Sequence, residues 1–424
     1  MTTELADAVA AVIDPKAHAD TPRLHGAYSW LRKNAPIALA EPEGFDPFHV
    51  VTKHADILEV SRDNTKFPYG EYPSTLAPVQ AVRRGREARA AGRPLLYTLV
   101  QMDEPDHMKY RALTQGWFMP QNIAKVEGRV RELAREAVAR MEALGGQCDF
   151  VNEVALHYPL RVIMEILGVP TADEPRMLKL TQEMFGSTDP DLKRKTESKT
   201  PEEEALAMQA VLMDFFNYFN ALTEDRRAHP VGDVASVIAN AKVDGEQISA
   251  FDAVSYYLII ATAGHDTTSS STAGALWALA ERPDQLAKVK ADPSLIAGLV
   301  DESIRWTTPV RHFMRSSAFD TELRGVKIRE GDWLMLCYPS GNRDEEVFED
   351  PFEFRVDRSP NRHLAFGYGA HLCLGQHLAK MEMRILWEEL LPRLKSVELA
   401  GQAKLSEANF VSGPKTLPIR YEFA

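Results

Sequence analysis

One cysteine, Cys373, lies between a glycine-rich loop and a helix-forming run over residues 376–395. The loop, residues 366–375, reads FGYGAHLCLG. The positive end of a helix dipole and the free N–H groups of the first turn both favour a thiolate, which can bind a metal. The glycines let the backbone turn sharply and leave room for a flat, bulky group. A buried structural cysteine is the plainer alternative, but the spacing of Phe, Gly, His and Cys favours a metal-ligand loop.

A second group of polar residues interrupts a long apolar-rich run over residues 247–281. Its centre, residues 261–268, reads ATAGHDTT and is followed by more Ser and Thr. Gly and Thr are weak helix formers, and their neighbours' hydroxyls can bond the carbonyl one turn back and bend a helix. The sequence therefore predicts a long helix with a functional distortion at its centre. The alternative is a buried helix whose hydroxyl groups are satisfied within it.

A third feature is the pair Glu302 and Arg305, which share one helical face at a spacing of three residues. Such a pair contributes little when it is exposed to solvent. Apolar neighbours, among them Leu299 and Ile304, indicate that this one is buried.

Composition limits the classes of protein that remain. The 424 residues carry a net charge of −12, which argues against nucleic acid or an anionic membrane as a partner. No apolar run of about 18 residues is present, and the first 19 residues lack the features of a secretory signal. Three cysteines are too few, and odd in number, for a disulfide framework, so we expect a reducing cytoplasm.

Periodicity predicts a mainly α fold with a small β region. No linker or repeat divides the chain, so residues 1–424 are expected to form a single domain. Besides the two segments above, helices are predicted over residues 126–144, 202–229 and 284–290, with Pro283 as a stop signal after the long central run. Strands are predicted over residues 48–52, 321–328, 333–338 and 417–423.

The cysteine loop resembles the haem-binding loop of the cytochrome P450 family, F-G-x-G-x-H/R-x-C-x-G, at every fixed position. The resemblance extends over roughly residues 28–419. It implies a helix-rich triangular prism around a buried haem b, with Cys373 as the proximal iron ligand. A thiolate ligand pushes electron density onto the iron and favours O–O cleavage. His371 occupies the position that contacts a haem propionate; the alternative is a histidine of a surface loop.

The same resemblance assigns roles to the other two motifs. Residues 263–268 match the family's A-G-x-D/E-T-T pattern, in which Thr267 hydrogen-bonds the oxygen being activated and Asp266 relays protons from solvent. Gly264 would leave room for oxygen, and His265 receives no catalytic role. The pair Glu302 and Arg305 matches E-x-x-R, a buried structural pair that Arg358 would complete.

Further positions follow from the resemblance alone. His107, Arg111 and Arg315 match residues that bind haem propionates, a task suited to charge-assisted donors; the alternative is solvated surface charge. Phe366 and Gly375 complete the predicted cofactor-binding set. Apolar positions that contact substrate in the family, and that could otherwise be ordinary core, are Leu95, Tyr97, Leu99, Ile259, Ala263, Phe313 and Phe410.

The resulting hypothesis is a soluble cytoplasmic haem-thiolate monooxygenase that uses dioxygen. Electrons would come from a two-iron ferredoxin and its flavin-dependent reductase, because the chain carries no flavin or iron–sulfur domain. The chain resembles bacterial terpene hydroxylases of the α-terpineol monooxygenase type, so a monoterpenoid or an aromatic or alkyl-aromatic hydrocarbon is the expected substrate. The identity of that substrate, the position and stereochemistry of attack, the particular ferredoxin and the oligomeric state do not follow from the sequence.

Departures from the family gather in residues 73–100, where a basic insert of unassigned role contains Arg83, Arg84, Arg86, Arg89 and Arg93. Three rival hypotheses remain. They are a peroxide-driven haem enzyme, a non-catalytic haem protein that senses gas or carries electrons, and a zinc protein using His371, Cys373 and His377. The predicted Asp–Thr relay argues against the first two, and the ligand spacing against the third.

Overall fold

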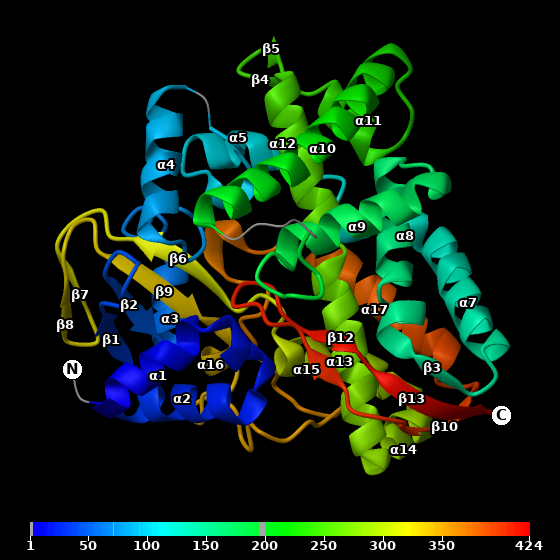
Figure 1. Ribbon diagram of the computed structural model, residues 1–424. Coiled ribbons are helices and arrows are strands. Elements are labelled where there is room, and N and C mark those ends of the chain that lie inside the picture. The colour runs from blue at the N-terminus through cyan, green and yellow to red at the C-terminus, as the bar shows by residue number, and fades with distance from the viewer. Residues whose placement is uncertain (1–2, 71, 93, 195–199) are drawn as a thin grey trace.

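The computed structural model describes residues 3–70, 72–92, 94–194 and 200–424, so that Arg93 of the basic insert lies outside the described residues. Helices make up most of the molecule, and the four-stranded main sheet lies to one side of them (Figure 1). The predicted mainly α class with a small β region is therefore confirmed. No helix in the described ranges is long and apolar enough to cross a membrane.

The main sheet has the strand order β1–β2–β9–β6. Strands β2 and β9 are parallel, with Phe48 opposite Trp333, and the other neighbours are antiparallel. The strand predicted over residues 321–328 is instead a hairpin, because Arg324 and Gly325 both have positive φ and reverse the chain. The strands of this region are β1 Ile37–Ala40, β2 Phe48–Val51, β6 His312–Ser316, β7 Thr321–Leu323, β8 Val326–Ile328 and β9 Trp333–Cys337.

The remaining strands are short and lie mostly near the carboxyl end of the chain. Strand β13 pairs antiparallel with both β10 and β3, and so joins the end of the chain to its middle. The bounds are β3 Gln147–Asp149, β4 Lys242–Val243, β5 Glu246–Gln247, β10 Leu394–Leu399, β11 Lys404–Leu405, β12 Pro414–Thr416 and β13 Pro418–Phe423.

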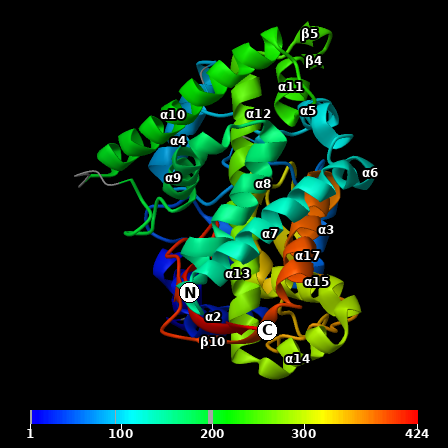
Figure 2. The same cartoon turned by 90° about the vertical axis from the view of Figure 1, so that its right-hand side faces the viewer.

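Two helices follow one another along the length of the molecule in both views, α12 Ala250–Ala263 and α13 Asp266–Glu281 (Figures 1 and 2). The sequence predicted one long helix with a central distortion, and the structure shows a complete break at Gly264 and His265. The break has a steric and a hydrogen-bonding component. A Cβ on Gly264 would lie 2.7 Å from Ile163 Cδ1 and 3.0 Å from the Ile260 carbonyl oxygen, so a larger residue would require Ile163 to move. The hydroxyl of Thr267 also donates to the Ala263 carbonyl at 2.9 Å.

The other helices pack around this central pair and, with it, bury most of the apolar core. Helix α17 ends at Leu390 rather than at the expected residue 395, because Pro392 cannot continue a helix and strand β10 begins at Leu394. The helix bounds are α1 Thr3–Ile13, α2 Thr21–Asn34, α3 His54–Arg62, α4 Val79–Ala90, α5 Asp106–Gln115, α6 Pro120–Ile123, α7 Glu127–Ala143, α8 His157–Leu167, α9 Glu174–Phe185, α10 Pro201–Ala228, α11 Val234–Ala239, α14 Pro283–Ala291, α15 Ile296–Thr307, α16 Tyr338–Gly341 and α17 Gln376–Leu390.

The basic insert forms helix α4. Val82 is its buried residue, and it packs into the smaller core beside the sheet. Arg83 pairs with Glu87 one turn on, Arg86 lies over the Tyr72 ring, and Arg89 donates to the Gly70 carbonyl. The insert is therefore an amphipathic helix held to the body by its arginines.

Candidate functional site

Cys373 lies at the wall of a cavity of about 590 Å³, immediately before helix α17. Its own N–H donates to the Phe366 carbonyl at 2.9 Å, which closes the loop. The backbone N–H groups of Gly375 and Gln376 are directed at its sulfur. A Cβ at Gly369, which has φ of +73°, would lie 2.2 Å from the Ser61 carbonyl oxygen. The loop can thus approach helix α3 this closely only with glycine at that position.

Burial of Cys373 opposes the predicted preference of its sulfur for the thiolate form. Burial raises the pKa of the Cys373 thiol, although Arg111 and the two N–H groups act in the opposite direction. The sequence indicates the N–H groups that favour the thiolate, but it does not indicate how deeply the sulfur is buried. A metal cation bound to the sulfur would favour the thiolate over the thiol, since a coordinating thiol is deprotonated.

Four cationic or titratable side chains gather at one edge of the cavity, namely His107, Arg111, Arg315 and His371. The rings of His107 and His371 lie 4.1 Å apart, and Arg111 donates to the Leu372 carbonyl at 2.8 Å. Burial and the neighbouring cations lower the pKa of His371 to about 2, and its Nε2 has no hydrogen-bond partner among the described residues.

Neither Arg111 nor Arg315 forms an ion pair with a carboxylate anywhere in the described ranges. Two arginines in a cavity wall without carboxylate partners fit a ligand that brings its own carboxylates. The two propionates of haem b meet that requirement, and the sulfur of Cys373 in the same cavity fits the iron. Phe366 and Gly375 line this space as well. No group of three or more His, Cys, Asp or Glu side chains in the described part of the chain could hold a metal ion by itself.

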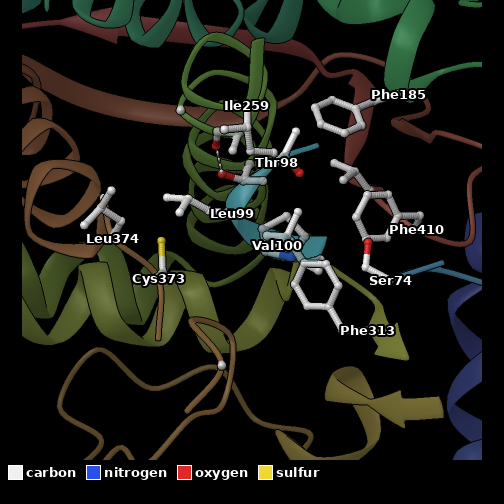
Figure 3. Close-up of a pocket in the computed structure, with 18 of the residues that line it drawn as sticks. Ser74, Thr98, Leu99, Val100, Phe185, Ile259, Phe313, Cys373, Leu374 and Phe410 are labelled. Atoms are coloured by element: carbon white, nitrogen blue, oxygen red, sulfur yellow. Dashed lines mark hydrogen bonds between the residues drawn. The ribbon is translucent and has the colours of Figure 1, made fainter. Parts of the chain in front are cut away.

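The rest of the cavity wall is largely apolar (Figure 3). Phe410 packs against Phe313 at 5.6 Å and against Phe185 at 6.1 Å between ring centres, so these rings form one aromatic wall. In the view of Figure 3 this wall lies away from Cys373, while Leu99 lies near the sulfur. Five predicted positions therefore line the cavity: Leu99, Ile259, Ala263, Phe313 and Phe410.

Two predicted substrate contacts are wrong, Leu95 and Tyr97. Leu95 is 58% exposed and does not line the cavity. Tyr97 is turned toward Asp106, to which its hydroxyl donates at 3.0 Å. The segment is irregular, so alternation along it does not say which side chains point inward.

The structure adds lining residues that the sequence did not identify. Helices α9 and α10 supply Met184, Phe185, Met208 and Leu212, and the segment before α5 supplies Thr98 and Val100. Neither helix carries a motif, and each looks like an ordinary amphipathic helix from its sequence. Their inward faces become recognisable only once their packing is known, that of α10 against α12 and that of α9 against α8, α10 and α13.

Thr267 lines the cavity, whereas Asp266 does not. Asp266 is the first residue of α13, directly after the helix break. Its carboxyl oxygen Oδ2 is buried and has no hydrogen-bond partner in the described ranges. Burial raises the pKa of Asp266, with His265 acting in the opposite direction. The two predicted relay residues are thus adjacent in sequence, but only the hydroxyl faces the cavity.

An acid that the sequence did not single out, Glu382 on α17, also lines the cavity. Its side chain is 2% exposed and its Oε2 has no partner among the described residues. Burial holds the pKa of Glu382 well above its ordinary value, although Thr268 lowers it. The wall of the cavity therefore contains a carboxyl group whose burial favours its neutral form.

Glu302, Arg305 and Arg358 meet in the core behind the loop. Arg305 forms a two-point pair with Glu302 at 2.7 and 2.8 Å, and Arg358 Nε donates to both oxygens of the same carboxylate at 3.1 Å. The remaining arginine N–H groups bind carbonyls of the segment before the cysteine loop, including that of Glu353. The three side chains thus tie helix α15 to the chain that leads into the loop.

Comparisons with known proteins agree with this geometry. The sequence profile described as "Cytochrome P450" matches residues 44–420. The chain is 48% identical to cytochrome P450-terp of a Pseudomonas species, over 97% of this chain and 96% of that protein. It is 31% identical to linalool 8-monooxygenase of Pseudomonas putida, over 93% and 95%. The crystal structure of CYP108D1 from Novosphingobium aromaticivorans superposes with a TM-score of 0.89 at 46% identity and covers 99% of both chains.

Proposed function

The chain belongs to the cytochrome P450 family, whose members are haem-thiolate monooxygenases, and from this premise we propose that it hydroxylates a monoterpenoid or a similarly small apolar hydrocarbon. The observation that carries the proposal is the cavity of about 590 Å³, which has Cys373 on one side and an aromatic and aliphatic wall on the other. An apolar pocket with few polar groups suits a small hydrocarbon. Two similar proteins are named for terpenes, which supports the same substrate class.

The haem supplies the reductive activation of dioxygen when it is bound. The side chains of this chain would hold the haem and the substrate, exclude water and supply protons. Cys373 would hold the iron, and Arg111, Arg315, His107 and His371 would bind the propionates. The phenylalanine wall would exclude water and hold the substrate by shape. Thr267 would organise the hydrogen bond through which a proton reaches the reacting oxygen, and Asp266 would resupply that proton.

Electrons are proposed to come from a cytoplasmic two-iron ferredoxin and its flavin-dependent reductase, docking on the face near Cys373. Lys109, Arg111, Lys380 and Arg384 are the basic candidates there. Three of them are ion-paired, Lys109 with Asp244, Lys380 with Asp301, and Arg384 with Glu388 and Glu127. Docking would therefore depend on exchanging these partners for ferredoxin carboxylates. Reduction rates that do not fall as ionic strength rises would contradict electrostatic docking.

The substrate proposal is tested with a graded set of ligands. The purified enzyme is titrated with α-terpineol, linalool, an alkylbenzene and a steroid, while the shift of the Soret band reports binding near the iron. The same compounds are then assayed for hydroxylated product with a surrogate ferredoxin and reductase. We expect the monoterpenoids to shift the band and to be hydroxylated. Preferential turnover of the steroid would overturn the proposed substrate class.

The role of Cys373 is tested separately. We expect Cys373→Ser to lose the thiolate-type carbon-monoxide spectrum and monooxygenase activity, while Cys148→Ser, at a half-buried cysteine remote from the cavity, retains both. A normal spectrum and normal turnover in Cys373→Ser would refute the assignment.

A further inference from the structure

Ser74 places an unpartnered hydroxyl group in the wall of the cavity. The residue lies in the irregular segment between α3 and α4, and its side chain lines the cavity. Ser74 is 5% exposed, and its Oγ has no hydrogen-bond partner among the described residues. Buried hydroxyls are normally paired, because an unpaired one costs free energy. An enclosed hydroxyl that faces a ligand cavity therefore indicates a ligand with a polar group.

The backbone around Ser74 is fixed to the main sheet. The Ser74 carbonyl accepts from the Met314 N–H at 2.9 Å, and the Leu76 N–H donates to His312 Nε2 at 3.0 Å. Met314 and His312 both belong to β6, which is an edge strand of that sheet. The hydroxyl is thus carried by a segment held on a regular element, which suits a group that must meet a ligand in one geometry.

Other buried hydroxyls of the wall are engaged or lie elsewhere. Ser271 donates to a carbonyl of its own helix at 2.9 Å. Thr98 takes part in a capping box at the start of the short turn that follows it. Tyr338 lies near Arg315, at the edge where the propionates would bind. Ser74 differs from these groups because its hydroxyl meets the substrate part of the cavity without a partner.

Ser74 and Cys373 lie at separate ends of the cavity. In Figure 3, Ser74 lies beside Phe410 and Phe313, and this group is well apart from Cys373. The aromatic rings next to Ser74 offer contacts to hydrocarbon but no hydrogen bond of the strength a hydroxyl gives. A ligand that fills the space between the two ends would therefore meet one polar group at the end remote from the sulfur.

We propose that Ser74 hydrogen-bonds the oxygen of an oxygenated monoterpenoid, an alcohol or a ketone, and so turns the hydrocarbon end of that substrate toward the iron. This inference rests on the proposed function and narrows its substrate class. A pure hydrocarbon that displaces solvent from Ser74 leaves the hydroxyl unpaired, whereas an alcohol replaces the hydrogen bond that solvent supplied. A site with such a polar group discriminates against the analogue that lacks the oxygen.

The test compares two ligands in three proteins. The ligands are α-terpineol and its deoxygenated counterpart, which has the same menthene skeleton without the hydroxyl group. The proteins are the haem-loaded wild type, Ser74→Ala and Ser187→Ala, and dissociation constants come from Soret titrations. Ser187 also lines the cavity but is exposed, so it provides a matched loss of a hydroxyl. The ratio of the two constants within each protein removes the difference in water solubility between the ligands.

We expect the preference for the alcohol to fall about three- to tenfold in Ser74→Ala, the range for one neutral hydrogen bond, and to stay unchanged in Ser187→Ala. An equal ratio in wild type and Ser74→Ala, with both ligands bound, would overturn the role of Ser74 and leave the proposed function intact. If neither compound shifts the Soret band, the substrate class itself is wrong and the inference fails with it. If Ser74→Ala does not fold, Ser74→Cys replaces the hydroxyl by a weak donor and should show the same fall.

The products give a second readout of orientation. We expect wild type to oxidise α-terpineol mainly at carbons remote from its hydroxyl group, and Ser74→Ala to spread oxidation over more positions. Gas chromatography of the products from both proteins measures this distribution. The same distribution in wild type and Ser74→Ala would overturn the orienting role.

Discussion

The guanidinium carbon of Arg315 lies 3.7 Å from the centre of the Tyr69 ring, and Arg315 is 3% exposed. The ring holds the arginine at the cavity edge without neutralising its charge. We predict that Arg315→Leu weakens haem retention by about 2 kcal/mol, or roughly thirtyfold, because a charge-assisted hydrogen bond to a propionate is lost. The measurement is the rate of haem transfer to an apo-globin acceptor. The exposed Arg420→Leu is the control, and an equal rate in both would contradict a propionate role.

Breaking the buried Glu302 cluster should reduce stability. Glu302→Gln leaves Arg305 and Arg358 without a charged partner at a site with no solvent exposure. We expect the free energy of unfolding to fall by about 3–5 kcal/mol. Urea denaturation monitored by circular dichroism gives this value. Glu398→Gln, which breaks an exposed pair with Arg420, should change little. Equal effects of the two variants would argue against the structural role.

A larger side chain at Ala263 should select among ligands by size. Ala263 faces the cavity one turn before Thr267. In Ala263→Phe we predict a loss of about 1–3 kcal/mol in the binding of bulky ligands, as in overpacked cores, with little change for the smallest. Dissociation constants from Soret titrations measure this. Leu95→Phe, outside the cavity, is the matched control. Uniform weakening across all ligand sizes would contradict a steric role for Ala263.

His312 should make the fold sensitive to acid. Its Nδ1 lies 2.9 Å from the Asn409 carbonyl and its Nε2 accepts from the Leu76 N–H at 3.0 Å, so the ring is held neutral. Burial lowers the pKa of His312 from 6.5 to about 4. Above pH 6.5 the ring is neutral in both folded and unfolded chains. As the pH falls below 6.5, only the unfolded chain binds the proton, and stability is lost until about pH 4.

The expected loss is about 3 kcal/mol between these two pH values. His312→Gln keeps an acceptor for Leu76 but does not titrate, so its free energy of unfolding should depend less steeply on pH. The exposed His229→Gln should behave like the wild type. Parallel pH profiles for wild type and His312→Gln would show that His312 does not contribute.

Loss of the Thr267 hydroxyl should uncouple electron use from product formation. We expect Thr267→Ala to bind haem and substrate and to consume reduced cofactor, but to release hydrogen peroxide. Product per electron pair should fall about tenfold, which corresponds to about 1.4 kcal/mol in the competition between the two outcomes. Thr267→Ser, which keeps the hydroxyl, should restore much of the coupling. Product and peroxide are measured together against cofactor consumed, and unchanged coupling in Thr267→Ala would exclude the role.

Residues whose chemistry and position are both local could be predicted from the sequence. The cysteine loop and the weak helix around Gly264 follow from glycine and hydroxyl residues close in sequence, whereas the close contacts of Gly264 with Ile163 and of Gly369 with Ser61 join distant segments. Prediction from the sequence reaches its limit at four residues, namely Leu95, Tyr97, Phe185 and Glu382. Whether each faces the cavity depends on how separate segments pack. The pKa of the Cys373 thiol could not be predicted for the same reason. The residue pattern indicates that Cys373 precedes a helix N-terminus, but it does not indicate how deeply the sulfur is buried.

Helix α17 begins immediately beyond the loop that carries Cys373 and, within its first two turns, reaches Glu382. Glu382 neighbours Thr268 of α13, the residue that follows Thr267. The six residue steps of helix from Gln376 to Glu382 span about 9 Å along a stiff axis. Because this helix is continuous, a displacement of the cysteine loop would move Glu382 with it through the chain itself.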